Sequence, residues 1–436
     1  MTQTTCDLAR STRPPLLLLA SLSALLLVPD SAVAQPAEPP PEEAPSEEAP
    51  PEEAPPEPPE EEKPVALPPP SAAPVKVSYD KGVIFESEDD EYELKLMLRT
   101  QIRAETKRSL ADGAEVTTTF SVPRARMQLE GHAFGKDTKY KLEFGFGDAG
   151  SFSFIKDVFI ERALANKLWL RVGQWKRPYN RQELVSDFAS QFNERAITSE
   201  FTGGGRDIGV ALHNEYDKSP EGLEWQLGVF NGFFGGVDRP KVTTTCTQDE
   251  AMKITCTVNN PTTAPPEGDF GPTVAARVGW NVGKIKGYSE SDLEGGPMRL
   301  AIGLGYRIDL ADLSKGAAES LGDNLSHGLQ IDAMLKVEGF SVIAGGYLMK
   351  LKTDDARFGA LAQAGYFVMP KKAEVAARFA YSDQIKDIKE KIEARGAFNW
   401  YWSGHNLKLA TDAGIVKNIG PDKPELVFRS MLQLSF

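Results

Sequence analysis

The feature that most constrains this chain is an alternation of apolar and polar side chains with a period of two residues, which recurs from residue 92 onward. In the segment YELKLMLRTQIRAE at residues 92–105, leucines at every second position are separated by Lys, Met and Arg. An α-helix would scatter these residues around its circumference, so the pattern predicts β-strands. One segment is irregular, because Lys156 falls on the face of the strand that also carries Val158 and Ile160.

The first 34 residues have the pattern of a secretory signal peptide. Arg10 and Arg13 precede an apolar stretch at residues 16–28, and Ala32-Val33-Ala34 forms a small-residue cleavage site. Outside this stretch there is no apolar run of about 18 residues, which excludes transmembrane helices but not a membrane β-barrel. The formal net charge of −13 argues against a nucleic-acid-binding protein.

The connections between the predicted strands alternate between long and short. Outer-membrane barrels have long outer loops and short periplasmic turns. The pattern therefore predicts an all-β fold, a transmembrane antiparallel β-barrel of about 16 strands at residues 92–436, with both chain ends on the periplasmic side. Two connections fit poorly, since 148–153 is brief for an outer loop and 282–297 is long for an inner turn. The long connections are expected around residues 106–116, 174–205, 231–272, 309–326, 350–357, 382–391 and 416–424, and the short ones at 134–138, 163–166, 217–222, 338–340, 369–372 and 402–405.

Residues 35–75 are predicted to be a periplasmic linker, followed by a lead-in segment at residues 76–91. The linker repeats Glu-Glu-Ala-Pro, cannot bury apolar surface and favours an extended polyproline II form. Two interpretations remain open. The segment is either a solvated spacer without a specific role or a tether that contacts the cell wall.

Three cysteines are present, and Cys6 is removed with the signal peptide. Cys246 and Cys256 remain, in a polar segment of an exported chain, where they either form a disulfide or stay as free thiols. A metal site needs more ligands than two Cys, and no His lies near them in sequence. No metal and no cofactor are predicted.

Basic residues occupy the face of the strands that is opposite to the aliphatic residues, and this face lines the interior of a barrel. Arg and Lys that line a pore favour anions, and the planar guanidinium of Arg suits phosphate. Carboxylates also point inward by the same rule, including Glu143, Glu224, Asp332, Glu374 and Asp412. The inward basic residues are Lys95, Arg99, Arg103, Arg124, Arg126, Arg171, Arg277, Arg299, Arg307, Arg378, Arg395 and Lys408.

No motif predicts an enzyme. The letters GFGDAG at residues 145–150 match a dinucleotide fingerprint, but a strand-like segment follows them where the fingerprint needs a helix. The four His residues are scattered among different predicted strands or loops, so no acid–base set is expected.

The stretch RVGQWKRPYNRQELVSDFASQFNERAITSEFTGGGRDIGVAL at residues 171–212 resembles the phosphate-selective porin O and P family. Its most specific elements are Gly173-Gln174 with Lys176 and Pro178, Glu194-Arg195, and Arg206-Asp207-Ile208-Gly209-Val210. The last strand, which ends in Phe436, resembles the assembly signal of bacterial outer-membrane proteins. The chain departs from the family where Pro123-Arg124 replaces two adjacent Arg.

The resemblance implies a 16-stranded outer-membrane barrel, usually a homotrimer, that passes anions through a lumen lined by Arg and Lys. It also implies that the connection after strand five, here residues 174–205, folds inward and narrows the barrel. A short helix is expected within it at Arg181–Ile197. Lys176, Arg177, Arg181 and Arg195 would add positive charge to that constriction.

Together these features predict a Gram-negative outer-membrane porin, a passive diffusion channel for small anions such as phosphate or polyphosphate. Two alternatives stay open: a weakly selective general porin for other small solutes, and a structural barrel anchor linked to the cell wall through residues 35–75. The expected partners are outer-membrane lipid, small anions and two further copies of the chain.

Overall fold

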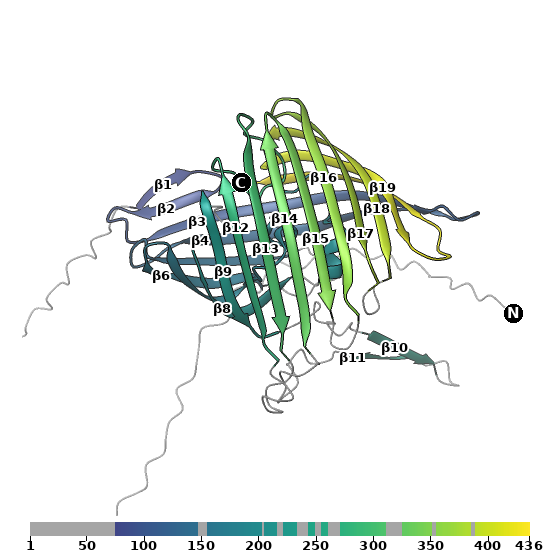
Figure 1. The fold of residues 1–436 in the computed structure, drawn as a ribbon, viewed down its shortest axis with the longest axis horizontal. Coiled ribbons are helices and arrows are strands. Elements are labelled where there is room, and N and C mark those ends of the chain that lie inside the picture. The colour runs from purple at the N-terminus through teal and green to yellow at the C-terminus, as the bar shows by residue number, and fades with distance from the viewer. Residues whose placement is uncertain are drawn as a thin grey trace, which may run out of the picture. The chain divides into compact units, whose positions relative to one another are not determined.

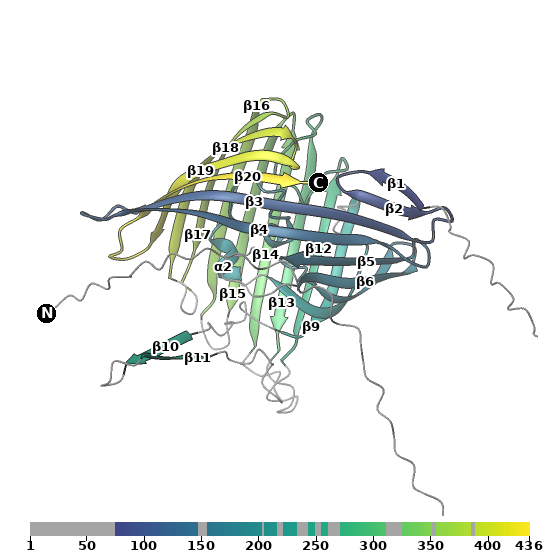
Figure 2. The ribbon, with the colours of Figure 1, turned by 180° about the vertical axis from the view of Figure 1, so that it is seen from behind.

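Sixteen antiparallel strands close into a single wall, β3–β9 followed by β12–β20 (Figures 1 and 2). The computed structural model describes residues 75–146, 155–202, 205–215, 221–232, 243–248, 254–259, 271–310, 325–350, 355–384 and 389–436. Each wall strand pairs with the next, β9 pairs with β12, and β20 closes onto β3. The prediction of a 16-stranded antiparallel β-barrel is confirmed. None of the helices among the described residues is long and apolar enough to cross a membrane.

The wall strands follow the chain order. They are β3 (Glu93–Ser109), β4 (Val116–His132), β5 (Thr138–Gly145), β6 (Ile155–Ala165), β7 (Leu168–Lys176), β8 (Arg206–His213), β9 (Gly222–Phe230), β12 (Thr273–Val282), β13 (Arg299–Asp309), β14 (Ser326–Val337), β15 (Phe340–Lys350), β16 (Arg357–Met369), β17 (Ala373–Ser382), β18 (Lys391–Ser403), β19 (Leu407–Asn418) and β20 (Glu425–Ser435).

The alternation in the sequence places apolar side chains outside the wall and polar ones inside it. On β14, Ile331 is 63% exposed, whereas Gln330 and Asp332 on either side of it are 0% and 5% exposed. This exposed apolar face is the one that would contact membrane. The interior is correspondingly polar, as expected for a water-filled barrel.

The simple alternation predicts that Lys156 faces lipid, but the structure buries its side chain. The pairing of β5 with β6 shifts register between Glu143 and Phe144, which are opposite Asp157 and Ile155 respectively. Lys156 is the extra residue of this bulge, and its side chain is buried while Ile155 is exposed. The bulge therefore removes Lys156 from this strand's outer face, on which Arg162 remains exposed.

Four further strands lie outside the wall. β1 (Val75–Tyr79) and β2 (Val83–Ser87) form a hairpin, and β2 pairs with the first residues of β3. The lead-in segment is thus strand, and the first strand begins at the last residue of the predicted linker. β10 (Thr243–Gln248) and β11 (Ile254–Asn259) form a second hairpin. The predicted signal peptide, the rest of the linker and the connection at 148–153 lie outside the described residues.

Candidate functional site: a constricted lumen

The connection after β7 packs against side chains on the inner face of the wall. We call residues 177–202 the inward segment. It contains two short helices, α1 (Arg181–Leu184) and α2 (Thr198–Thr202), and most of its side chains are buried. α1 begins at Asn180, whose side-chain Oδ1 accepts a hydrogen bond of 3.0 Å from the Gln182 backbone N–H.

The predicted single helix at Arg181–Ile197 is wrong. Between α1 and α2 some backbone N–H groups donate to carboxylates of the wall: the N–H of Asn193 to Asp412 on β19 (3.0 Å) and the N–H of Ile197 to Glu393 on β18 (3.1 Å). The wall also donates to the carbonyls of this stretch, for example from the Lys408 Nζ to the Ser190 oxygen (2.7 Å). These bonds satisfy backbone groups that a helix would otherwise pair internally.

The inward segment divides the lumen into two vestibules. The short-turn vestibule is a cavity of about 640 Å³ lined mainly by β3–β8, and it reaches the inward segment at Leu184 and Ser186. The long-loop vestibule, of about 510 Å³, lies among β3, β18, β19 and β20 and includes Glu194 and Arg195. A third space, of only about 10 Å³, shares Ser186 with one vestibule and Glu194 and Arg195 with the other. We call this space the constriction.

Arginines of the wall face carboxylates of the inward segment at the constriction. Arg124 on β4 donates to Glu194 Oε2 at 2.7 Å, and Arg103 on β3 bonds the other oxygen of the same carboxylate. Asp187 lies 2.9 Å from Arg126 on β4, 2.6 Å from Arg195 and 3.5 Å from Arg124.

These contacts decide the ionisation of both carboxyl groups. Burial alone would raise the pKa of Asp187, but the positive charges of Arg195, Arg124 and Arg126 hold it well below its ordinary value. Burial likewise opposes ionisation of Glu194, and Arg124 and Arg103 lower its pKa. Both carboxylates are therefore anionic at neutral pH and offset part of the positive charge of the wall.

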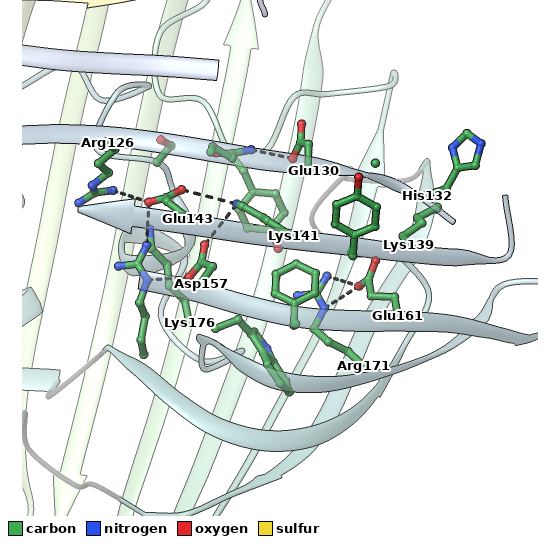
Figure 3. A pocket seen from close by; sticks show the side chains of 18 of the residues that line it. Arg126, Glu130, His132, Lys139, Lys141, Glu143, Asp157, Glu161, Arg171 and Lys176 are labelled. Atoms are coloured by element: carbon green, nitrogen blue, oxygen red, sulfur yellow. Dashed lines mark hydrogen bonds and ion pairs between the residues drawn. The ribbon is translucent and has the colours of Figure 1, made fainter. Parts of the chain in front are cut away.

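The short-turn vestibule carries an excess of basic side chains. Eight Lys or Arg line it against five Asp or Glu. Figure 3 shows that several are paired: Lys141 lies between Glu143 and Asp157, at 3.8 and 3.2 Å, and Arg171 contacts Glu161. The Lys176 Nζ instead donates to the Val185 carbonyl oxygen at 3.0 Å. Within the described part of the chain, no carboxylate lies within 4 Å of this nitrogen.

The structure places the predicted basic residues inside the barrel but divides them into two groups. One group lines the vestibules or the constriction: Arg99, Arg103, Arg124, Arg126, Arg171, Lys176, Arg195 and Arg395. The other group lines none of these cavities: Lys95, Arg177, Arg181, Arg277, Arg299, Arg307, Arg378 and Lys408.

Several members of the second group hold the inward segment in place. Arg277 on β12 and Arg181 in α1 both bind Asp332, and Arg378 on β17 binds Glu393 and the Glu194 carbonyl oxygen. Buried pairs of this kind are structural and leave little charge for a passing solute.

Sequence reasoning missed several lining residues. Lys139, Lys141 and Arg206 line the short-turn vestibule, and Arg429 on β20 lines the long-loop vestibule. The alternation of inward and outward side chains that identified Arg171 would also have found Lys139, Lys141 and Arg429. It would not have found Arg206, which has the parity of the outward-facing Ile208 and Val210. Sequence reasoning also missed Glu290 at the constriction. The unusual length of the connection at 282–297 was the signal that could have identified it.

The comparisons with known proteins agree with this architecture. Residues 95–254 match the model of the phosphate-selective porin O and P family. No curated protein matches the chain. Among solved structures, the anion-selective porin from Comamonas acidovorans has a TM-score of 0.51 at 12% identity, covering 79% of this chain and 100% of that chain. Pseudomonas putida OprB has a TM-score of 0.49 at 12% identity, covering 80% of this chain and 95% of that chain.

At this identity the structural likeness shows the fold, and the family match adds the sequence relationship. The chain therefore has the 16-stranded β-barrel fold of outer-membrane porins, and its residues 95–254 are similar to the phosphate-selective porin O and P family.

Proposed function

We propose that this channel passes small anions, phosphate among them, in preference to cations. The observation that carries the proposal is the short-turn vestibule, with eight basic side chains against five acidic ones. The long-loop vestibule is nearly balanced, with six against five. An anion that has passed the constriction thus enters a region of positive potential, which raises its local concentration.

Lys176 is the side chain we propose as the first anion contact on this side of the constriction. It lies at the end of β7, beside the inward segment, and its charged neighbours are the basic Arg195 and Arg206 and the acidic Asp187 and Glu183. Its present partner is a carbonyl oxygen, which an anion could replace without breaking an ion pair. Several weak sites of this kind conduct better than one tight site, because a tightly held ion does not leave.

The test is the reversal potential of the purified channel in a planar bilayer under a chloride gradient, followed by titration of phosphate against the chloride current. Anion preference with block by phosphate supports the proposal, and Lys176→Gln should then weaken the block. Lys417→Gln is the matched control, since Lys417 lies on β19 and lines none of the three cavities. A cation-selective or unselective current that phosphate leaves unchanged would contradict the proposal.

One observation favours a weakly selective general porin as the second candidate. At the constriction itself, Arg103, Arg124 and Arg126 are paired with Glu194 or Asp187, so the positive charges there are largely compensated. An unselective reversal potential in the same experiment would support this candidate.

The assembly and envelope contacts remain proposals. The family resemblance supports a homotrimer, which native mass spectrometry of the detergent-solubilised protein would test. Contact of the linker with the cell wall is tested by deleting residues 35–74. A channel with a passive spacer should keep its conductance and its envelope attachment, whereas a tether should lose the attachment alone.

A further inference from the structure

A second segment enters the lumen, from the end of the barrel with the short turns. We call residues 283–298, between β12 and β13, the inner insert. Ser291 and Asp292 in this insert are each 2% exposed. The Asp292 carboxylate accepts from Arg299 at 2.5 Å and from the Gly339 N–H at 2.9 Å, and Lys336 donates to the Lys286 carbonyl oxygen at 3.0 Å. The wall therefore holds the insert in a defined position.

The inner insert meets the inward segment in the middle of the barrel. The Glu290 N–H donates to the Ala189 carbonyl oxygen at 3.0 Å. In return, the Glu290 Oε2 accepts from the Gln191 N–H at 2.8 Å and from Gln363 Nε2 on β16 at 3.0 Å. One residue thus joins the inner insert, the inward segment and the wall.

A second contact joins the two inserted segments. The Arg181 Nη1 of α1 donates to the Gly287 carbonyl oxygen at 2.9 Å. The inward segment is consequently anchored on strands β14–β19 and on the inner insert. One vestibule lies along β3–β8 and the other at β3 and β18–β20.

We propose that Glu290 is a positioning residue of the constriction and, through its charge, a determinant of its selectivity. The inference rests on the proposed function, since it assumes that solutes pass through the narrow space. Glu290 lines that space together with Arg124 and Arg195. Its carboxylate holds the Gln191 end of the inward segment in place and contributes a third negative charge beside Asp187 and Glu194.

Two substitutions separate the two roles. Glu290→Gln keeps a side-chain oxygen that can accept from the Gln191 N–H but removes the charge, so the bore should stay constant while the reversal potential shifts toward anions. Glu290→Ala removes the acceptor as well, so the inward segment should loosen. The single-channel conductance should then rise, with larger fluctuations of the open current.

Glu294 provides the matched control within the same insert. Its carboxylate pairs with Lys286 and Arg299, both at 2.6 Å, and it lines none of the three cavities. Glu294→Gln should leave both conductance and reversal potential as in the wild type. Far-ultraviolet circular dichroism and heat-modifiable migration on gels establish that each variant is folded.

The outcomes distinguish this inference from the proposed function. The wild-type reversal potential tests anion preference, whereas only the difference between each variant and the wild type tests Glu290. An unselective wild type with an anion shift in Glu290→Gln supports the role of Glu290 and refutes anion preference. If both Glu290 variants conduct like the wild type, or if Glu294→Gln gives the same shift as Glu290→Gln, the inference is overturned. If Glu290→Ala does not fold, the reversal potential of Glu290→Gln alone tests the inference.

Discussion

The Asp187 carboxylate lies 2.6 Å from the guanidinium of Arg195, and Arg126 and Arg124 share the same carboxyl group. Removing this negative charge leaves three arginines at the constriction with less compensation. Asp187→Asn should therefore shift the reversal potential toward anions and strengthen block by phosphate. The control is Asp422→Asn, because Asp422 is outside the lumen cavities and pairs with Lys389. A shift toward cations would show that the inward segment moves when Asp187 is neutralised.

The low pKa values of Asp187 and Glu194 predict how the constriction responds to acid. Their pKa values are depressed in the folded protein, so their stabilising ion pairs are intact above the ordinary carboxyl pKa and are lost as pH falls through the depressed values. Selectivity and open-channel noise should stay constant between pH 7 and 5. They should change only below about pH 4, the ordinary midpoint of carboxyl titration, because both groups have lower pKa values than an ordinary carboxyl group.

The measurement is the current of single channels recorded at stepwise lower pH. Asp187→Asn should show a smaller response to acid than the wild type, since one of the two groups is absent. A midpoint near pH 6 in the wild type would mean that other groups control the constriction.

Asp332 on β14 neutralises two buried arginines, one in the wall and one in the inward segment. Its carboxylate accepts from Arg277 at 2.7 and 2.9 Å and also binds Arg181. Asp332→Ala leaves both guanidinium groups without this partner, and the loss of a buried partner costs about 3 kcal/mol of unfolding free energy.

Urea unfolding in detergent, followed by tryptophan fluorescence, would measure that loss. Asp383→Ala is the control, because Asp383 pairs with the half-exposed Arg357 at 3.9 Å. An exposed pair of this kind contributes less than about 1 kcal/mol. Equal effects of the two substitutions would be inconsistent with a structural role for Asp332.

Cys246 and Cys256 are directly opposite each other in the antiparallel pair β10–β11. Opposed residues have Cα atoms about 4.5 or 5.5 Å apart, which is within the range that a disulfide spans. We predict that the exported protein carries this disulfide. Alkylation of the denatured, unreduced protein should add no mass, whereas Cys256→Ser should take up one alkyl group at Cys246. Two adducts on the wild type would show free thiols.

Most of the wall was predictable because its physics is local. A strand between lipid and water needs alternating side chains, and each strand carries this pattern in its own residues, as Ile331 between Gln330 and Asp332 illustrates. The bulge at Lys156 was not predictable, since it depends on the register with β5.

The interior was predictable only in part, for a related reason. The alternation of side chains along β12 shows that Arg277 points inward. It does not show that Asp332 neutralises Arg277 or that Arg181 reaches the same carboxylate. The irregular backbone between α1 and α2 also depends on acceptors such as Asp412 and Glu393, which are some 200 residues away in sequence. No local signal encodes those contacts.

The pairing of β20 with β3 has a consequence for the order of assembly. The wall cannot close until β20 has been delivered, although β3 and the inward segment come much earlier in the chain. Gln433 on β20 donates to the Phe188 carbonyl oxygen at 2.9 Å and accepts from Gln101 on β3 at 2.8 Å. Gln433 thus contacts both the inward segment and the first wall strand. The strand that seals the wall therefore also completes the contacts that hold the inward segment within it.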